Sequence, residues 1–133
     1  MPIPTNAVTV EQPFDPRDVL EVKVGISQGA EDANPPPILL LNESVASLGV
    51  AVSTEAAAVG LKVVSGTLDG ATYPAPSINQ NIVTFWVTVD ESRRGDAAFD
   101  GAGVTVGVEL TFKTNNNPPR VKQRTVALRM AQQ

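Results

Sequence analysis

The sequence predicts an all-β protein whose antiparallel strands form two sheets packed as a sandwich. Apolar and polar side chains alternate with a period of two in several runs, which is typical of half-buried strands. Turn-forming Gly, Pro, Asn and Asp residues separate these runs about every ten to fifteen residues, and only one short segment favours a helix. About seven short strands spaced in this way indicate a sandwich rather than a barrel or a parallel sheet.

Residues 1–16 are predicted to form an extended, proline-rich N-terminal arm, ahead of a β-sandwich domain that spans residues 17–133. Pro2, Pro4, Pro13 and Pro16 exclude a helix there and disfavour a place in a central strand. We expect at most one edge strand in this region, at residues 7–10.

The first two strands of the domain are expected at residues 18–27 and 45–53, where apolar residues alternate with polar or small ones. Between them, residues 28–37 are polar and end in three consecutive prolines. The composition predicts an exposed loop that neither packs nor pairs, and an interaction could be located there.

A short helix is expected to follow, because Ser53 can cap a turn through residues 55–58 and Gly60 suits a left-handed C-terminal position. Strands are then predicted at residues 61–65 and 82–90. The second of these is apolar on both faces, as in a central strand that is covered on each side. Its Trp86, the sole tryptophan, is expected in the core.

In the C-terminal third, the sequence predicts a loop at residues 92–103, followed by a hairpin. Residues 104–113 alternate without a break, which makes them the clearest strand in the chain. The Asn- and Pro-rich residues 115–119 predict a turn. The partner strand begins at residue 120, and its inward side chains are expected to be Val126, Leu128 and Met130.

The composition of the 133-residue chain argues against most enzyme chemistries, because it contains neither cysteine nor histidine. Disulfides, thiolate nucleophiles, imidazole ligands and the usual general base near neutral pH are therefore excluded. We expect no catalytic residue, cofactor or metal site. No run approaches the ~18 apolar residues of a membrane span, so a soluble protein without a membrane partner is expected.

Charge is unevenly distributed along the chain, whose formal net charge is −4. All 14 acidic residues lie within residues 1–110, whereas the charged residues among 111–133 are all basic. Nucleic acid is not the expected partner of this basic segment, because the net charge is negative and no aromatic residues are interleaved to stack on bases. An acidic protein surface is expected instead.

Three short motifs are better explained without a function. Residues 94–96 spell Arg-Gly-Asp and residues 42–44 form a glycosylation sequon, but tripeptides recur by chance and we expect a protein made without a secretory signal. The carboxylates between residues 90 and 100 are irregularly spaced and have neighbouring arginines. A solvated loop therefore fits them better than a Ca²⁺ site.

Several segments together resemble small immunoglobulin-like structural proteins of tailed bacteriophages. The resemblance runs from about residue 15 to residue 130 and is carried by residues 15–20 (Asp-Pro-Arg-Asp-Val-Leu), 60–63 (Gly-Leu-Lys-Val), 85–87 (Phe-Trp-Val) and the terminal hairpin. Members often carry a Gly-Arg pair after the last turn, and Asn-Asn-Asn-Pro-Pro-Arg stands there instead. Neither the arm nor the Pro-Pro-Pro loop belongs to the resemblance.

The resemblance implies an immunoglobulin-like antiparallel β-sandwich of about seven strands and a non-enzymatic virion component synthesised in the host cytoplasm. We expect a capsid decoration, or cement, protein that binds the outer surface of the major capsid protein and copies of itself, with a trimer as the first expected oligomer. Two alternatives are a tail, connector or fibre-base protein and a carbohydrate- or cell-binding module, because a fold does not fix a role.

Partner-binding residues are predicted in two places. Prolines in the arm preset the backbone for extended binding, which lowers the ordering cost. Basic side chains of the hairpin suit an acidic neighbour. The predicted residues are Pro2, Ile3, Pro4, Val8, Val10 and Phe14 in the arm and Arg120, Lys122, Arg124 and Arg129 in the hairpin.

Overall fold

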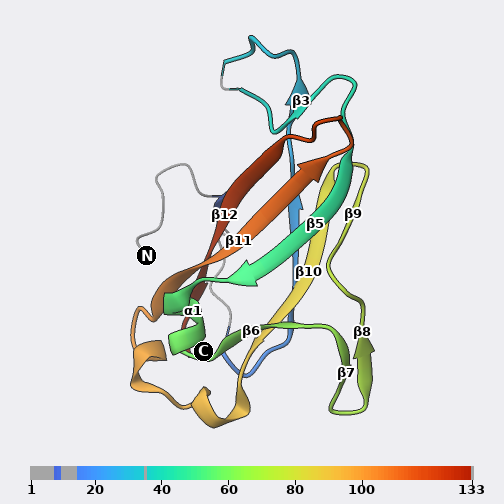
Figure 1. Cartoon of the computed structure of the whole chain (residues 1–133). Coiled ribbons are helices and arrows are strands. Elements are labelled where there is room, and N and C mark those ends of the chain that lie inside the picture. Colours follow the sequence, from blue (N-terminus) through green and yellow to red (C-terminus); the bar gives the residue numbers. More distant parts are fainter. Residues whose placement is uncertain (1–7, 10–14, 35, 133) are drawn as a thin grey trace.

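The computed structural model describes residues 8–9, 15–34 and 36–132 and confirms an all-β protein (Figure 1). Most of the strands belong to two main sheets, and two small two-stranded sheets accompany them. One short α-helix and two 3₁₀ helices complete the regular structure of this part of the chain. None of the described helices is long and apolar enough to cross a membrane.

The first main sheet has the strand order β1-β12-β11-β5. Its antiparallel hairpin consists of β11 (Val104–Thr114) and β12 (Val121–Met130). On the far side of β11 lies β5 (Val45–Val52), also antiparallel. The short β1 (Val8–Thr9) pairs with β12 in parallel. These pairings confirm the predicted terminal hairpin, the strand near residues 45–53 and an edge strand within residues 7–10.

The second main sheet has β10 (Ile82–Val89) at its centre. One side of β10 pairs antiparallel with β2 (Leu20–Gly25). The other side pairs with β6 (Leu61–Val64) and, further along, with β9 (Ser77–Asn79). The sequence-based prediction of a central strand at residues 82–90 is therefore confirmed.

The helix α1 (Thr54–Ala58) lies where the sequence predicted it. The Ala56 N–H donates to the Ser53 side-chain oxygen at 3.1 Å, so Ser53 is the N-cap residue. The chain leaves the helix through Gly60, whose φ of 90° is accessible at low cost to glycine alone.

Residues 28–37 were predicted as a loop that neither packs nor pairs, and this prediction is wrong. A parallel pair joins β3 (Gln28–Gly29) to β4 (Leu39–Leu40), and Pro37 is buried. Ser27 organises the return of the chain, because its hydroxyl accepts from the Ile38 N–H at 3.0 Å and its carbonyl from the Leu39 N–H at 3.0 Å. Proline lacks a backbone N–H donor, but its own side chain can be buried and the residues that follow it can pair as a strand.

Two further segments contain more structure than the sequence predicted. The Gly-, Asp- and Pro-rich region after residue 65 holds a hairpin of β7 (Gly66–Leu68) and β8 (Ala71–Tyr73). Asp69 and Gly70 both have positive φ at its turn, which suits the twist of a tight hairpin. The predicted loop at residues 92–103 contains the 3₁₀ helices η1 (Glu91–Arg93) and η2 (Ala97–Phe99), and it buries Phe99 completely.

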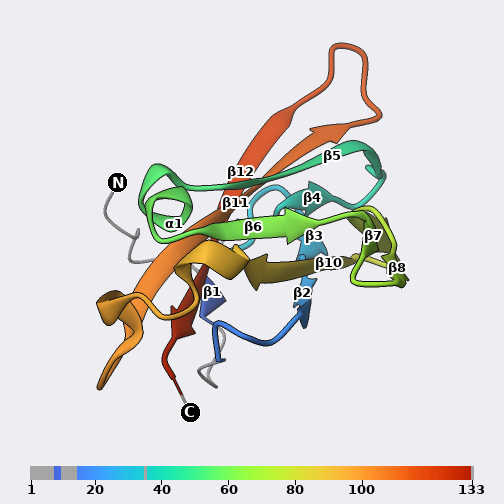
Figure 2. The ribbon, with the colours of Figure 1, turned by 90° about the horizontal axis from the view of Figure 1, so that it is seen from below.

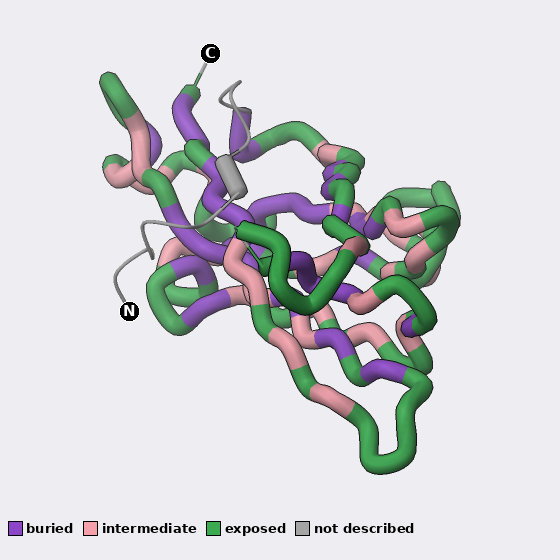
Figure 3. Tube along the Cα trace, turned by 90° about the horizontal axis from the view of Figure 1, so that it is seen from above, coloured by how far each residue is buried: buried purple, intermediate pink, exposed green. Residues whose placement is uncertain are grey.

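The core lies between the two main sheets, which form separate layers in Figure 2. Buried segments run along the strands, and exposed segments occupy most of the connecting loops (Figure 3). Both sheets contribute to one hydrophobic cluster. Its largest fully buried side chains are Phe85, Phe99, Phe112, Leu39, Leu110, Leu128 and Met130. The inward positions predicted for Val126, Leu128 and Met130 are confirmed.

Trp86 was expected in this core, and that expectation is wrong. In β10 the fully buried side chains are those of Phe85 and Val87, so Trp86 projects from the opposite face of the sheet and is only half-buried. Its ring lies against Tyr73, with the two ring centroids 5.2 Å apart. An unbroken apolar run predicts a cover on both faces of a strand, but it does not distinguish the core from the partial cover that Tyr73 of β8 provides here.

Candidate protein-interaction site

Loops from distant parts of the chain meet at the end of the molecule that carries β3 (Figure 1). The side chain of Gln28 links three of them. Its Nε2 donates to the carbonyl oxygens of Leu40 at 2.9 Å and Glu43 at 2.8 Å, and its Oε1 accepts from Asn81 Nδ2 at 3.0 Å. This single amide therefore fixes the start of β3, the segment after β4 and the turn before β10 relative to one another.

The carboxylate of Glu43 is the second centre of these contacts. Its side chain is only 3% exposed, and it forms an ion pair with Arg120. Arg120 Nε donates to Oε2 at 2.8 Å, Arg120 Nη2 donates to Oε1, and the Leu40 N–H donates to Oε1 at 2.7 Å. Donors on both oxygens favour the charged form, with the Arg120 hydrogen bonds as the main cause, and they lower the pKa of Glu43 from its usual 4.5 to about 2.

The turn between β11 and β12 is bound to the same end. Asn115 Oδ1 accepts from the Ser44 N–H at 3.0 Å, and the Asn115 N–H donates to the Ser44 carbonyl at 3.0 Å. The Arg120 N–H donates to the buried Thr114 hydroxyl at 2.8 Å, which closes the turn. We call Gln28, Glu43, Asn81, Asn115 and Arg120 the loop-end network.

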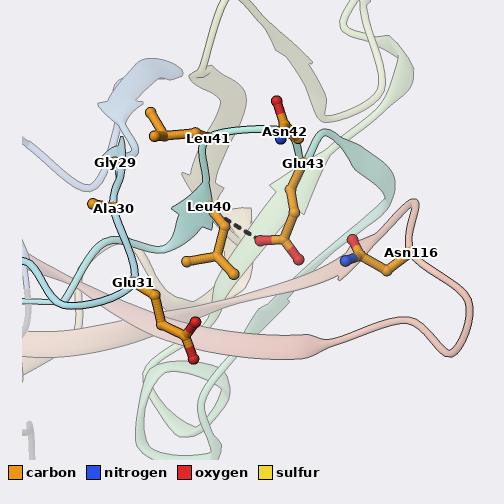
Figure 4. Close-up of a pocket in the computed structure, with 8 residues that line it drawn as sticks. All are labelled: Gly29, Ala30, Glu31, Leu40, Leu41, Asn42, Glu43 and Asn116. Carbon is orange, nitrogen blue, oxygen red and sulfur yellow. Dashed lines mark hydrogen bonds between the residues drawn. The ribbon is translucent and has the colours of Figure 1, made fainter.

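An open hollow of about 360 Å³ lies beside the loop-end network (Figure 4). Leu40 and Leu41 provide its apolar lining, and Glu31, Asn42 and Asn116 provide polar groups. The carboxylate of Glu43 also borders it, but this group is ionised and held by Arg120. Because a general acid or base needs a pKa near the working pH, Glu43 itself is unsuited to proton transfer at neutral pH.

The large exposed hydrophobic side chains of the described residues are all adjacent to the loop-end network. They are Leu41, Ile82 and Val121, with 68%, 45% and 58% exposed. Leu41 precedes Glu43 by two residues, Ile82 follows Asn81, and Val121 follows Arg120. They surround this end of the molecule rather than form one patch, because Ile82 and Val121 project from the outer faces of different sheets. Single exposed apolar residues are common, but several gathered at one end of a domain favour a role in binding another protein.

The basic residues predicted to bind a partner do not form one patch. The guanidinium of Arg120 is half-buried in its ion pair with Glu43. Lys122 and Arg124 lie opposite Phe112 and Leu110 in the β11–β12 ladder, so they project from the core-facing side of the sheet. Both are partly exposed there. Arg129 projects from the other side, opposite Thr105, near the far end of the strand.

Of the partner-binding residues predicted in the arm, the structure places Val8, which pairs with Val126 in the β1–β12 ladder. The edge that carries Arg124 therefore also carries β1. The others, Pro2, Ile3, Pro4, Val10 and Phe14, lie outside the described residues.

Sequence reasoning missed Gln28, Leu41 and Glu43 as members of this site. Glu43 and Arg120 are 77 positions apart, and no local pattern indicates that an acid in one loop meets a base in another. Gln28 was predicted only as part of an exposed loop. A weak signal existed, because Leu40 and Leu41 are apolar residues between two polar segments.

Comparisons with known proteins provide no relative: no family model matches the chain, and no curated protein or solved structure shows significant similarity to it.

Proposed function

We propose that the two main sheets form an immunoglobulin-like sandwich of seven strands, in which β6 and β9 occupy one strand position along the same side of β10. In that fold, strands C, F and G form one sheet and strands B, E and D lie next to one another in the other. Assigning letters in chain order to β1, β2, β5, β6, β10, β11 and β12 gives the orders C-F-G for β5-β11-β12 and B-E-D for β2-β10-β6. The strand orders therefore support the fold that the phage resemblance implies.

We further propose that the chain is a non-enzymatic virion protein of a tailed bacteriophage that decorates the capsid by binding the outer surface of the major capsid protein. The observation that carries this proposal is the exposure of Leu41, Ile82 and Val121 around the loop-end network. The network holds its loops in place before any partner binds, and a preorganised surface loses little entropy on binding. Repetition over a symmetric shell would multiply a modest affinity.

A binding experiment with matched variants tests the docking end. Leu41→Asp and Val121→Asp should each weaken co-sedimentation of the purified chain with capsids assembled without it. Ala102→Asp is the control, because Ala102 is also exposed but belongs to the segment just before β11. This segment lies at the end of the molecule opposite to β3 (Figure 1). Equal binding by all three variants would contradict the proposed surface.

Copy number distinguishes the capsid from the tail. Quantitative mass spectrometry of purified virions should find the chain in numbers comparable to the capsid subunits. A small fixed number per particle would instead support the tail, connector or fibre-base alternative.

A second candidate function, carbohydrate binding, is favoured by the contact between Tyr73 and Trp86. These are the sole tyrosine and the sole tryptophan of the chain, and they lie together on the outer face of the second sheet. Saturable binding on a glycan array that Trp86→Ala abolishes would support this role over capsid decoration.

A further inference from the structure

The strand β5 forms one edge of the first main sheet, and no described residue pairs with its outer side. The nearest strands of the other sheet, β6 and β9, approach β5 without forming a ladder with it. None of its eight residues is buried. A row of backbone N–H and C=O groups on an exposed edge is a template for another strand.

This edge lacks the features that normally prevent such pairing. From Ser44 to Thr54 the sequence contains no charged residue and no proline. The other edges of the two main sheets are either charged or very short. Charges occur at Glu21 and Lys23 on β2, at Lys62 on β6, and at Lys122 and Arg124 in the part of β12 that β1 does not cover. The edge strands β1 and β9 have only two and three residues. Natural proteins guard exposed edges with charges, short strands or proline. An unguarded strand of eight residues therefore indicates that its edge is covered in the functional state.

The free backbone groups of β5 can be assigned from one hydrogen bond. The Ser53 N–H donates to the Gly107 carbonyl of β11 at 3.0 Å. Because the backbone groups of successive residues in an antiparallel strand point to alternate sides, Ala51, Gly49 and Ser47 also face β11. The N–H and C=O groups of Ala46, Leu48, Val50 and Val52 therefore point outward.

We propose that β5 pairs antiparallel with β5 of a second copy of this chain, about a twofold axis at Gly49. This register is the one that engages every outward-pointing residue, because Leu48 then exchanges hydrogen bonds with Val50 of the copy and Ala46 with Val52. A second copy of the chain suits this edge for two reasons. Two copies of an uncharged strand do not repel each other, and the copy supplies a strand of the same length. A twofold contact of this kind is self-complementary.

The inference goes beyond the proposed function, because it concerns the contact between copies and applies whatever the chain binds. It joins two four-stranded sheets into one continuous sheet. A contact made through one strand edge alone is expected to bury less than the ~1,600 Å² of a standard protein complex, so we expect a dimer whose population depends on concentration.

Charge placement on β5 tests the pairing. In the proposed register Ser47 lies opposite Ala51 of the copy, and both are exposed on the outer face. The double variant S47K/A51K therefore puts like charges directly opposite each other at two symmetric places. It should weaken the dimer roughly tenfold in sedimentation equilibrium.

The matched variant S47E/A51K changes the same two residues but puts opposite charges across the interface. It should dimerise at least as tightly as the wild type. Within one chain it also folds without conflict, because Ser47 pairs with Lys113 and Ala51 with Glu109 in the β5–β11 ladder. A wild-type chain that is monomeric up to millimolar concentration, or equal dimerisation of the two variants, would overturn the proposal.

A cysteine variant provides a test that does not depend on the charge variants folding. The chain has no cysteine, so Gly49→Cys introduces a single thiol at the proposed twofold axis. A Cβ there meets only ordinary contacts with Thr111, at 3.7 Å or more. Mild oxidation should yield a disulfide-linked dimer much faster than for Gln123→Cys, which is exposed on the outer face of β12. Equal rates of crosslinking would contradict the pairing.

Discussion

The half-buried Arg120 and the buried Glu43 form an ion pair that joins the start of β12 to the segment between β4 and β5. The Arg120 guanidinium contacts both carboxylate oxygens and also donates to the Ile38 carbonyl at 3.2 Å. A carboxylate removed from water in this way depends on its partner, because an unpaired buried charge is costly. The pair therefore makes the arrangement of the loop end dependent on the ionisation of Glu43.

Stability should fall in acid because of Glu43. Its folded-state pKa of about 2 lies below its usual 4.5, so the folded state favours the ionised form. The resulting stabilisation is fully present above about pH 4.5 and is lost as pH falls toward 2. Urea unfolding at a series of pH values should show this decrease, and Glu43→Gln should remove part of the dependence. A Glu43→Gln variant with an unchanged acid profile would contradict the assignment.

Replacing Arg120 should destabilise the fold more than replacing another arginine of the same strand. Arg120→Gln leaves the Glu43 carboxylate buried without its main partner, so the free energy of unfolding should decrease at neutral pH. Arg129→Gln is the control, because Arg129 is exposed and its loss should change that free energy by no more than about 0.5 kcal/mol. Chemical denaturation of the two variants measures the difference. Similar values would show that the ion pair contributes little.

Much of the fold was predictable because its signals are local. Unbroken alternation fixed the inward side chains of β11 and β12, since the period of two leaves one choice of face. Ser53 and Gly60 predicted the boundaries of α1 through cap chemistry, which depends on a few neighbouring residues. The strand order was not predictable, because periodicity does not state which strands pair.

The loop end was not predictable, because its contacts join residues that are distant in sequence. Gln28 was expected in a loop that does not pack, yet its amide forms hydrogen bonds that join its own segment to two others, around Glu43 and Asn81. Phe99 was assigned to a loop, because its neighbours are Gly, Ala and Asp, although η2 buries it against the core. The four basic residues of the hairpin looked like one patch in the sequence, but the ladder distributes them over two faces and one ion pair.

Gly103 should be far less tolerant of substitution than Gly101. Both glycines have positive φ, so alanine is strained at either position by about 1–2 kcal/mol. At Gly103 a Cβ would also lie 2.0 Å from the Met130 carbonyl oxygen, whereas at Gly101 no atom lies within 4 Å. Gly103→Ala should therefore show the larger loss in thermal unfolding, well beyond that of Gly101→Ala. Equal losses would mean that β12 can move away at Met130.

Ser53→Ala should destabilise the protein by about 1 kcal/mol, the usual cost of losing an N-cap. The Ser53 hydroxyl is buried and accepts from the Ala56 N–H, which the variant leaves without that partner. Ser65→Ala is the control, because Ser65 is exposed. Urea unfolding should separate the two variants. A neutral Ser53→Ala would indicate that water replaces the cap.

Charge reversal on β12 should reveal which face of the hairpin meets the proposed partner. Lys122 and Arg124 lie near the loop end on the core-facing side of the sheet, whereas Arg129 lies near the far end of the strand on the outer face. Lys122→Glu and Arg124→Glu should therefore weaken capsid binding several-fold at low ionic strength, and the difference from the wild type should shrink as salt screens the charges. Arg129→Glu makes the same change in net charge and should bind like the wild type. Co-sedimentation with capsids over a range of salt concentrations measures these effects, and loss of binding by Arg129→Glu alone would place the contact at the far end of β12 instead.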